Sequence, residues 1–250
     1  MPKKVRQDAI LDILQKQGFV TVKELTALLD YSSATINRDL NEMEKRGLAK
    51  RSYGGVEAAI TKLYLPLPGR YDWQRKVKMH LAKVAAEHIK DGDTVFIDAG
   101  TTTSYIGTYL ADKKDVHVIT NNIQLAQQLS QGNCKVTVLG GLVRESPCML
   151  AGDETVENIW RYHADKMFFT SIAFASDGRI SGGTAHHLIH RAMMECSKKV
   201  YYLANAQKCR EDFNINVCTF SRVDGVISDY VFPDEIKEKY PKTEFLKIEL

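Results

Sequence analysis

Apolar residues recur every three or four positions in the first fifty residues, and this spacing predicts three short helices. The first predicted helix has an apolar face that consists of Val5, Ala9, Ile10, Ile13 and Leu14. Gly18 follows this pattern, and a glycine at that position commonly ends a helix.

The second and third predicted helices begin at side chains that commonly cap helices. In "TVKELTALLD", Thr21 and Glu24 have the spacing of a capping box, in which each side chain satisfies a backbone N–H of the other residue. After "DYSS", Ser32 or Ser33 can cap the third helix, "SATINRDLNEMEKRG". Two helices joined by so short a turn indicate a helix-turn-helix. The inward face of the third helix would consist of Ile36, Leu40 and Met43.

The segment "LAKRSYGGVEA" predicts a wing after the third helix. Two short strands would turn at Gly54 and Gly55, because paired glycines favour tight hairpin turns. We therefore predict a winged helix-turn-helix domain over residues 1–58. The next segment, "ITKLYLPLPGRYDWQRK", has two prolines and a glycine within four residues, and it predicts a linker that we place at residues 59–75.

Residues 76–250 change to an alternation of strands and helices. A helix marked by Trp73, Val77, Leu81, Val84, Ala85 and Ile89 is predicted to end before Gly92. The apolar runs that predict strands are "TVFIDA", "VHVIT", "KVTVLG", "KMFFTSIAFA", "KVYYLA" and "GVIS". Helical segments such as "IQLAQQLSQ", "DETVENIWRYH" and "LIHRAMMECS" lie between them. This alternation predicts an α/β domain with a mostly parallel sheet covered on both faces.

The net charge of the 250-residue chain is +3, and the positive excess lies entirely in its first segment. Residues 1–55 contain ten of the 34 Lys and Arg residues and seven of the 31 Asp and Glu residues, and the rest of the chain contains 24 of each. A local basic excess is typical of a surface that binds a polyanion, although a solvated surface has the same composition.

The cysteines and the apolar runs restrict the class of protein. Five cysteines without C-x-x-C spacing argue against a disulfide framework and against a zinc site, and they favour a reducing compartment. The N-terminus has no apolar segment of a signal peptide, and no run of about 18 apolar residues predicts a membrane span. The sequence therefore predicts a cytoplasmic protein without a metal or a cofactor.

The outward face of the third predicted helix carries side chains that suit DNA. Arg38 can bond guanine and Asn37 can bond adenine, while serine and threonine hydroxyls can hold phosphates. The alternative is a three-helix interaction module with a charged surface, but the caps, the short turn and the basic flanks together favour DNA. The predicted DNA-binding residues are Lys3, Lys4, Arg6, Ser32, Ser33, Thr35, Asn37, Arg38, Arg51 and Tyr53. Paired heads read palindromic sites, so we also predict a homo-oligomer, either a dimer or a tetramer.

Polar residues follow four of the predicted strands, most clearly in "FIDAGTTTSYIG". Ligands of parallel sheets bind at the carboxyl ends of the strands. Hydroxyls and N–H groups at a helix start, together with a lysine, can hold a phosphate, while Asp98 and Asn121 could bond sugar hydroxyls. The predicted effector-binding residues are Asp98, Gly100, Thr101, Thr102, Thr103, Asn121, Gly140, Gly141, Arg144 and Lys208.

The sequence resembles the DeoR family of bacterial sugar-metabolism regulators over nearly its whole length. The segments that carry the resemblance are, in order, "SATINRDLNEMEKRG", "KRSYGG", "GDTVFIDAGTTT", "VITNN" and "VLGG". The resemblance implies a winged helix-turn-helix joined to an α/β sensor domain of the ribose-phosphate isomerase and glucosamine-phosphate deaminase fold. It also implies a repressor of a sugar-metabolism operon whose operator binding responds to a phosphorylated sugar. By resemblance, Gly100 to Thr103 would hold the phosphate, and Asp98, Asn121 and Lys208 would face the rest of the ligand.

The chain departs from the family pattern at three places. "TINRDL" has Asn37 where the family commonly has an arginine, and "LANAQKC" has Asn205 where an aspartate is usual. "GGTAHHLIHRAMM" has His186, His187 and His190 where acidic residues are usual. The i, i+4 spacing of His186 and His190 allows a metal-binding face, but a third ligand is not evident, and histidines at this spacing are more often part of a polar helix surface.

The alternative to a sensor is a sugar-phosphate isomerase or deaminase with a DNA-binding head. Isomerisation requires a carboxylate base beside the substrate carbon. The segment "ASDGRISGGTA" contains only Asp177, and "ANAQKC" contains no acid. The position of Asp98 beside the phosphate turn fits hydroxyl binding better than proton transfer. The sequence therefore predicts a DNA-binding regulator rather than an enzyme.

Overall fold

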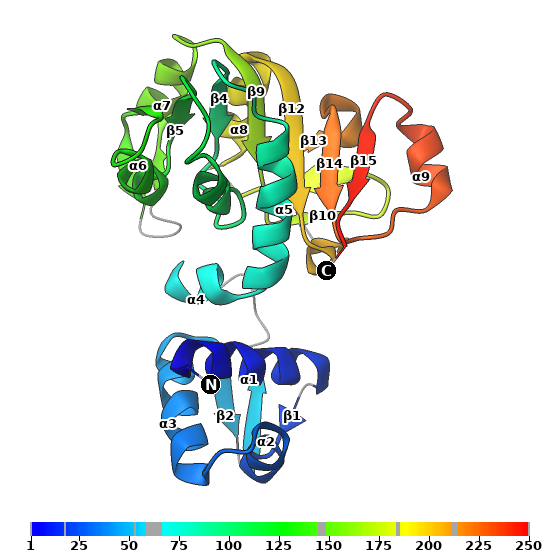
Figure 1. Ribbon diagram of the computed structural model, residues 1–250. Helices are drawn as coiled ribbons and strands as arrows, with labels where there is room; N and C mark the ends of the chain where they lie inside the picture. Colours follow the sequence, from blue (N-terminus) through cyan, green and yellow to red (C-terminus); the bar gives the residue numbers. More distant parts are fainter. Residues whose placement is uncertain are drawn as a thin grey trace. The chain divides into compact units, whose positions relative to one another are not determined.

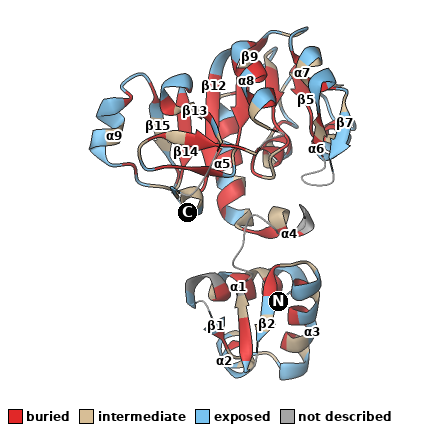
Figure 2. Ribbon diagram, turned by 180° about the vertical axis from the view of Figure 1, so that it is seen from behind, coloured by how far each residue is buried: buried red, intermediate tan, exposed pale blue. Residues whose placement is uncertain are grey.

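A computed structural model describes residues 2–17, 19–52, 54–58, 67–144, 149–183, 186–211 and 215–249 (Figure 1). The chain divides into two compact units, Met1–Arg75 and Lys76–Leu250. Each unit has a buried apolar core of its own (Figure 2).

The N-terminal unit is a winged helix-turn-helix, as predicted. Its helices are α1 (Lys3–Gln17), α2 (Val22–Leu29) and α3 (Ser33–Lys45), and its strands are β1 (Phe19–Val20), β2 (Ala49–Ser52) and β3 (Gly55–Ala58). The strands pair antiparallel in the order β1-β3-β2. Gly54 lies between the two strands of the wing with a φ of 85°, a backbone conformation that favours glycine.

The predicted caps and the predicted inward face of α3 are confirmed, whereas Val5 of the predicted apolar face of the first helix is 50% exposed. Thr21 and Glu24 form the capping box of α2, with Thr21 N donating to Glu24 Oε2 at 2.7 Å and Glu24 N donating to Thr21 Oγ1 at 3.2 Å. Ser32 rather than Ser33 caps α3. The core side chains Ile10, Leu14, Leu25, Ile36, Leu40 and Met43 are at most 1% exposed.

The predicted linker, residues 59–75, contains a short helix, α4 (Leu67–Asp72). Asp72 forms ion pairs with Lys4 at 3.1 Å and with Arg46, so the end of this segment belongs to the N-terminal unit. Trp73 packs into the core of the same unit, and the prediction that it begins the next helix is wrong. Gln74 has a φ of 54°, which interrupts the helical backbone before α5 (Arg75–Glu87).

The C-terminal unit contains a parallel sheet, as predicted. Among the described residues, seven strands form this sheet in the order β15-β14-β12-β9-β4-β5-β6. They are β4 (Thr94–Ile97), β5 (His117–Thr120), β6 (Lys135–Val138), β9 (Ala164–Phe169), β12 (Ser197–Ala204), β14 (Gly225–Ser228) and β15 (Glu244–Lys247). Every pairing between neighbours in this sheet is parallel.

Shorter elements surround the sheet. The helices are α6 (Ile123–Leu129), α7 (Asp153–Ile159), α8 (His187–Glu195) and α9 (Asp234–Lys239), with 3-10 turns at Thr103–Tyr109, Ala206–Lys208 and Phe220–Arg222. Two antiparallel groups are the hairpin of β7 (Leu142–Arg144) with β8 (Met149–Ala151) and the sheet of β10 (Ala173–Phe174), β11 (Arg179–Ser181) and β13 (Asn216–Thr219). The predicted strand "KMFFTSIAFA" is therefore two strands, β9 and β10, on either side of Thr170–Ile172.

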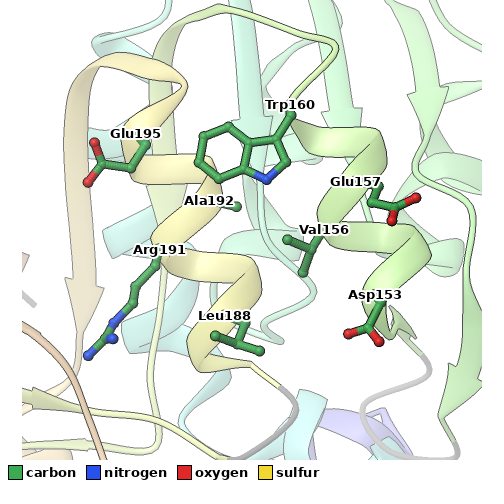
Figure 3. A pocket seen from close by; sticks show the side chains of 8 residues that line it. All are labelled: Asp153, Val156, Glu157, Trp160, Leu188, Arg191, Ala192 and Glu195. Carbon is green, nitrogen blue, oxygen red and sulfur yellow. The ribbon is translucent and has the colours of Figure 1, made fainter.

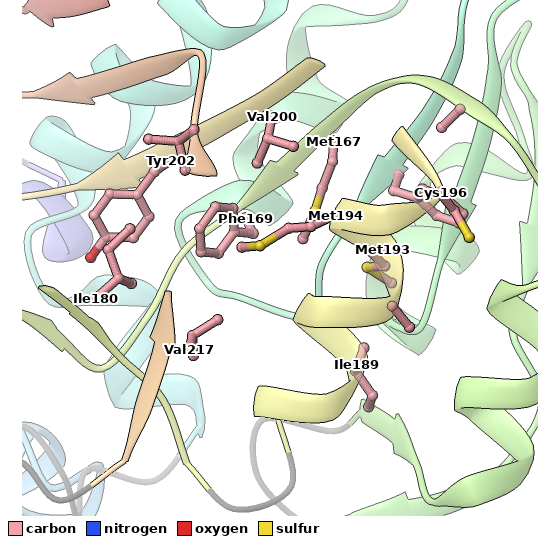
Figure 4. Close-up of a cluster of buried hydrophobic side chains, with 14 of the residues drawn as sticks. Met167, Phe169, Ile180, Ile189, Met193, Met194, Cys196, Val200, Tyr202 and Val217 are labelled. Carbon is pink, nitrogen blue, oxygen red and sulfur yellow. The ribbon is translucent and has the colours of Figure 1, made fainter. Parts of the chain in front are cut away.

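Both faces of the parallel sheet are covered by apolar side chains. Ile97 and Phe168 pack on the face covered by α5 and α6, whereas Phe96 and Phe169 pack on the face covered by α7 and α8. Figure 4 shows the second group, in which Met193 and Met194 of α8 lie over Met167 and Phe169. Adjacent residues of one strand thus enter opposite cores, which explains the continuous apolar runs of these strands.

The strand order places the polar strand ends side by side. β12, β9, β4 and β5 are successive neighbours, so the residues that follow them meet at one edge of the sheet. No helix among the described residues is long and apolar enough to cross a membrane.

Candidate functional site

The outward face of α3 presents the predicted DNA-reading residues. Ser33 and Arg38 are exposed, whereas Thr35 and Asn37 are half-buried. Ser32 is engaged in capping, because its Oγ accepts the backbone N–H of Thr35 at 3.3 Å. Arg38 makes no hydrogen bond or ion pair with any described residue, so its guanidinium is available to a base edge.

The wing holds the middle of α3 through Arg51. This side chain donates to Asn41 Oδ1 at 2.6 Å and also to Asn37 Oδ1. Asn37 Nδ2 in turn donates to the backbone oxygen of Ser33 at 2.8 Å. Both polar atoms of the Asn37 amide are therefore engaged in the free protein, and contact with a base would require an exchange of these bonds. Tyr53, also predicted to bind DNA, lies outside the described residues.

The predicted basic flank of α1 is engaged by acids of the same unit. Lys3 Nζ lies 2.5 Å from Glu42 Oε1, although its side chain remains half exposed. Lys4 pairs with Asp72, as described above. Arg6 is directed inward, where its Nε lies 2.5 Å from Oδ2 of Asp39, a residue that is 1% exposed. Of these three cations, Lys3 and Lys4 keep exposed side chains that can also meet a phosphate, whereas Arg6 mainly neutralises Asp39.

Asp98 follows β4 and is 2% exposed. Its Oδ1 accepts hydrogen bonds from Gly100 N at 3.2 Å and from Thr103 Oγ1. Its Oδ2 accepts from Thr170 N at 3.2 Å and from His190 Nε2 at 3.0 Å. Burial alone would raise the pKa of this carboxyl, but the bond and charge of His190, with the bonds from Thr103 and Thr170, lower it. Asp98 is an ionised group that anchors the turn.

Gly100 is required by the close packing of this turn. A Cβ atom at this position would lie 2.1 Å from Thr170 Cγ2 and 2.9 Å from Thr103 Oγ1. The backbone oxygen of Gly100 accepts from Ser104 Oγ at 2.7 Å and from Ser104 N at 3.0 Å. The turn therefore has one defined conformation, stabilised by its own hydroxyl groups.

Two lysines donate to hydroxyl groups at this sheet edge. Lys208 Nζ lies 2.5 Å from Thr170 Oγ1, and Lys78 Nζ lies 3.0 Å from Thr101 Oγ1. Lys208 was predicted from the sequence, but Lys78 was missed. Lys78 is 4% exposed on the buried face of α5, and a lysine within that apolar pattern was the available signal. Both ammonium groups can supply positive charge to a phosphate.

Asn121 and Asn122 follow β5 and have different partners. Asn122 caps α6, and its Nδ2 donates to Ser104 Oγ at 2.7 Å, which ties the two strand ends together. Asn121 Nδ2 donates to the backbone oxygen of Leu150 at 3.0 Å, so the orientation of this amide is defined. Oδ1 of Asn121 has no partner among the described residues.

Four buried polar atoms, three in residues that follow strands and one on α8, have no hydrogen-bond partner among the described residues. They are Thr102 Oγ1, Asn121 Oδ1, His190 Nδ1 and Asn205 Oδ1. Their residues are between 1% and 3% exposed. An unsatisfied buried polar group costs about 1–3 kcal/mol, so these four atoms are candidate contacts for a polar ligand. The name strand-end site is used below for the following residues: Lys78, Asp98, Gly100, Thr101, Thr102, Thr103, Asn121, Thr170, His190, Asn205 and Lys208.

The predicted residues Gly140, Gly141 and Arg144 have different surroundings. Gly140 O accepts from Thr155 Oγ1 of α7 at 2.7 Å, and a Cβ atom at Gly141 would lie 2.0 Å from the same hydroxyl. Gly141 thus allows α7 to pack closely, whereas Gly140 contacts α7 through its backbone oxygen. Arg144 is exposed at the end of β7 and bonds no described residue of the strand-end site.

An apolar groove of about 310 Å³ lies between α7 and α8 (Figure 3). Trp160 and Leu188 line it and are about half exposed. None of its lining residues belongs to the strand-end site. His190, the residue of that site that lies on α8, is buried and does not line the groove. Among the described residues, no group of three His, Cys, Asp or Glu side chains is arranged to hold a metal ion.

The fold, the outward face of α3 and the strand-end site together define a class of protein, a DNA-binding transcriptional regulator with a sensor domain. The family model of the DeoR-like helix-turn-helix domain matches residues 6–62, and that of the DeoR C-terminal sensor domain matches residues 73–230. The chain belongs to the DeoR family.

The curated relatives of the chain include transcriptional repressors that it matches over most of their length. The glycerol-3-phosphate regulon repressor of Escherichia coli is 28% identical, and the match covers 92% of each chain. The transcriptional repressor AccR of Agrobacterium fabrum is 27% identical over 94% of this chain and 95% of its own. The repressor GlcR of Bacillus subtilis is 28% identical over 92% of this chain and 89% of its own.

Solved structures that match part of the chain include ribose 5-phosphate isomerase A of Neisseria gonorrhoeae. It has a TM-score of 0.41 and 15% sequence identity, and it covers 55% of each chain. The eIF2B beta subunit of Chaetomium thermophilum has a TM-score of 0.43 and 14% identity, and it covers 72% of this chain and 46% of its own.

Proposed function

We propose that this chain represses an operon of sugar metabolism, and that a phosphorylated sugar bound at the strand-end site modulates its operator binding. The observation that carries the proposal is the set of four buried polar atoms without partners beside a turn rich in hydroxyl groups. The turn and the lysines suit a phosphate, and the amide oxygens of Asn121 and Asn205 suit hydroxyl donors.

The names of the relatives agree with this class of effector. They include a repressor named for the glycerol-3-phosphate regulon and one named for the aga operon. Ligand binding would favour one arrangement of the chain over another, and thereby change the affinity of the paired heads for their half-sites.

The test is a titration of operator DNA, selected from a random library, at fixed salt concentration. We expect at least one compound among ribose 5-phosphate, fructose 6-phosphate, glucose 6-phosphate and glycerol 3-phosphate to change the operator affinity and to raise the melting temperature of the protein. If none of them has either effect, a sugar phosphate is not the effector.

A role as sensor fits the strand-end site better than isomerisation does. A general base needs a carboxylate oxygen free to accept a proton from the substrate. Both oxygens of Asp98 already accept hydrogen bonds from the protein. Asp177 is bonded by Arg179 at 2.8 Å. We therefore propose that the site binds the sugar phosphate without converting it, and incubation with ribose 5-phosphate should yield no ketose.

We further propose that the chain acts in the cytoplasm as a homo-oligomer. A single small DNA-binding domain makes few base contacts. Two such domains bind a palindromic operator with a much higher affinity than one domain does. Size-exclusion chromatography with light scattering of the complex with operator DNA should give more than one chain per duplex. One chain per duplex would contradict the proposal.

Replacing Arg38 with alanine is expected to weaken binding to the selected operator by about 1–3 kcal/mol, the contribution of a good bidentate contact to a base. Binding to random DNA should change little. Arg51→Ala is the comparison, because its loss also releases Asn37 and Asn41. An equal loss on both DNAs in fluorescence anisotropy would assign Arg38 to a phosphate contact instead.

Replacing Thr102 with valine is expected to affect stability and ligand binding in opposite directions. The hydroxyl has no partner among the described residues, so its removal should stabilise the free C-terminal unit by about 1 kcal/mol. The same change should weaken binding of the active sugar phosphate several-fold. Calorimetric melting and ligand titration measure the two effects.

Thr155→Val is the matched control for this substitution. Thr155 is equally buried, but its hydroxyl donates to Gly140 O at 2.7 Å. This variant should lose about 1 kcal/mol of stability and should keep its ligand affinity. If both variants lost stability equally, the Thr102 hydroxyl would have a partner in the free protein.

A further inference from the structure

His190 combines one engaged ring nitrogen with one that has no partner. It is 2% exposed, and its Nε2 lies 3.0 Å from Asp98 Oδ2. The ionised carboxylate can only accept, so Nε2 carries the hydrogen. Nδ1 is then an acceptor in the neutral ring and a donor in the protonated ring. In either form it requires a partner that no described residue supplies.

Two aromatic rings lie beside the His190 imidazole. The Phe169 ring lies 5.1 Å from the imidazole between centroids, and the His186 ring lies 5.8 Å away. Asp98 Oδ2, which accepts from Nε2, also accepts from Thr170 N, and Thr170 Oγ1 accepts from Lys208 Nζ. The imidazole ring therefore lies beside the strand ends that carry Asp98 and Thr170.

We propose that His190 Nδ1 bonds a hydroxyl group of the effector and selects for phosphorylated sugars with at least three hydroxyl groups. The inference rests on the proposed function, since it assigns the atoms that read the part of the ligand beyond its phosphate. The three readers are His190 Nδ1, Asn121 Oδ1 and Asn205 Oδ1, all buried and without partners among the described residues. A hydroxyl group both donates and accepts, so it satisfies Nδ1 in either protonation state.

Two departures of this sequence from the family pattern fit this assignment. The helix of His190 lacks the acidic residues expected from the resemblance, and Asn205 stands in place of an aspartate. In the structure both residues contribute a buried polar atom that has no partner among the described residues. A ring nitrogen and two amide oxygens would thus recognise the hydroxyl groups, while the only carboxylate among the described site residues orients His190.

Two substitutions separate the roles of the two nitrogens. In His190→Gln the amide nitrogen occupies the place of Nε2, so the bond to Asp98 is kept and the group at Nδ1 is lost. In His190→Asn the amide nitrogen occupies the place of Nδ1, so the bond to Asp98 is lost. His163, an exposed histidine outside the strand-end site, provides the control His163→Gln.

The experiment measures melting temperatures and calorimetric affinities of the full-length variants for inorganic phosphate, glycerol 3-phosphate, ribose 5-phosphate, fructose 6-phosphate and glucose 6-phosphate. We expect the wild-type protein to bind one of the three sugar phosphates more tightly than glycerol 3-phosphate or phosphate. His190→Gln should melt near the wild-type temperature and bind that sugar phosphate about tenfold more weakly. His190→Asn should melt at a lower temperature, and His163→Gln should match the wild-type protein.

The outcomes distinguish this inference from the proposed function. If the wild-type protein binds none of the sugar phosphates, the proposed function fails. If it binds one and His190→Gln binds it equally, the assignment of His190 fails while the proposed function stands. Nitrogen NMR of ¹⁵N-histidine in the wild-type protein gives an independent result, because the Nδ1 resonance of His190 should shift on saturation with the bound sugar phosphate. An unchanged resonance would overturn the assignment.

Discussion

Replacing Asp98 with alanine is expected to lower the free energy of unfolding of the C-terminal unit by about 3–5 kcal/mol. The carboxylate accepts from His190 Nε2, from Thr103 Oγ1 and from two backbone N–H groups, and all four donors belong to residues of the strand-end site. Alanine would leave them without an acceptor. Differential scanning calorimetry of the full chain measures the loss, and a change below about 1 kcal/mol would contradict this account of the turn.

The pH dependence of the stability of Asp98 variants and of the wild-type protein provides the control. Because the folded-state pKa of Asp98 is lowered, its contribution to stability is complete above the ordinary carboxyl pKa of 3.8 and is lost as the pH falls through the lower folded value. Asp98→Asn keeps an acceptor oxygen and should lose less stability than Asp98→Ala. Below the ordinary pKa, the stability difference between Asp98→Asn and the wild-type protein should shrink as the pH falls.

Replacing Asp39 with alanine is expected to destabilise the N-terminal unit by about 3–5 kcal/mol and to abolish operator binding. Asp39 is 1% exposed, and its loss leaves the largely buried Arg6 without its counter-charge. A domain of this size has a small stability margin, so much of it should be unfolded. Trp73 is buried in this unit and Trp160 lies in the other, so Trp73 fluorescence in a Trp160→Phe background reports the N-terminal unit alone.

The double variant Arg6→Met, Asp39→Leu tests the origin of this effect. Buried ion pairs can often be replaced by apolar residues at little cost, whereas the loss of one partner leaves an uncompensated charge. We expect the double variant to recover most of the stability that Asp39→Ala loses. Recovery of stability without operator binding would show that Arg6 also contacts DNA.

The fold could be predicted from local patterns because those patterns and the tertiary structure agree. The capping box at Thr21 and the apolar face of α3 depend on residues within one or two turns, and both are present. Trp73 shows where this reasoning fails. Its spacing matches the apolar face of α5, but the conformation of Gln74 separates it from that helix, and a backbone conformation of this kind has no signature in the spacing.

The strand-end site could be predicted in part. The turn at Gly100 and the polar strand end at Asn121 follow apolar runs directly, so their position at the sheet edge follows from the parallel topology. Lys78 and His190 come from helices, and only tertiary packing determines which helix residue reaches that edge. Asp98 was predicted to face a ligand, a role that remains a prediction, and in the structure both of its oxygens already have protein donors.

The unsatisfied atoms of the strand-end site imply that thermal stability and the response to the effector are opposed in this regulator. Substitutions that delete such an atom should relieve a penalty in the empty protein and remove a contact with the effector at the same time. A selection that rewards heat resistance alone is therefore expected to enrich repressors that no longer respond to their metabolite. Evolution under fluctuating nutrient supply would retain the less stable protein, because the buried polar atoms without partners are the ones that bind the effector.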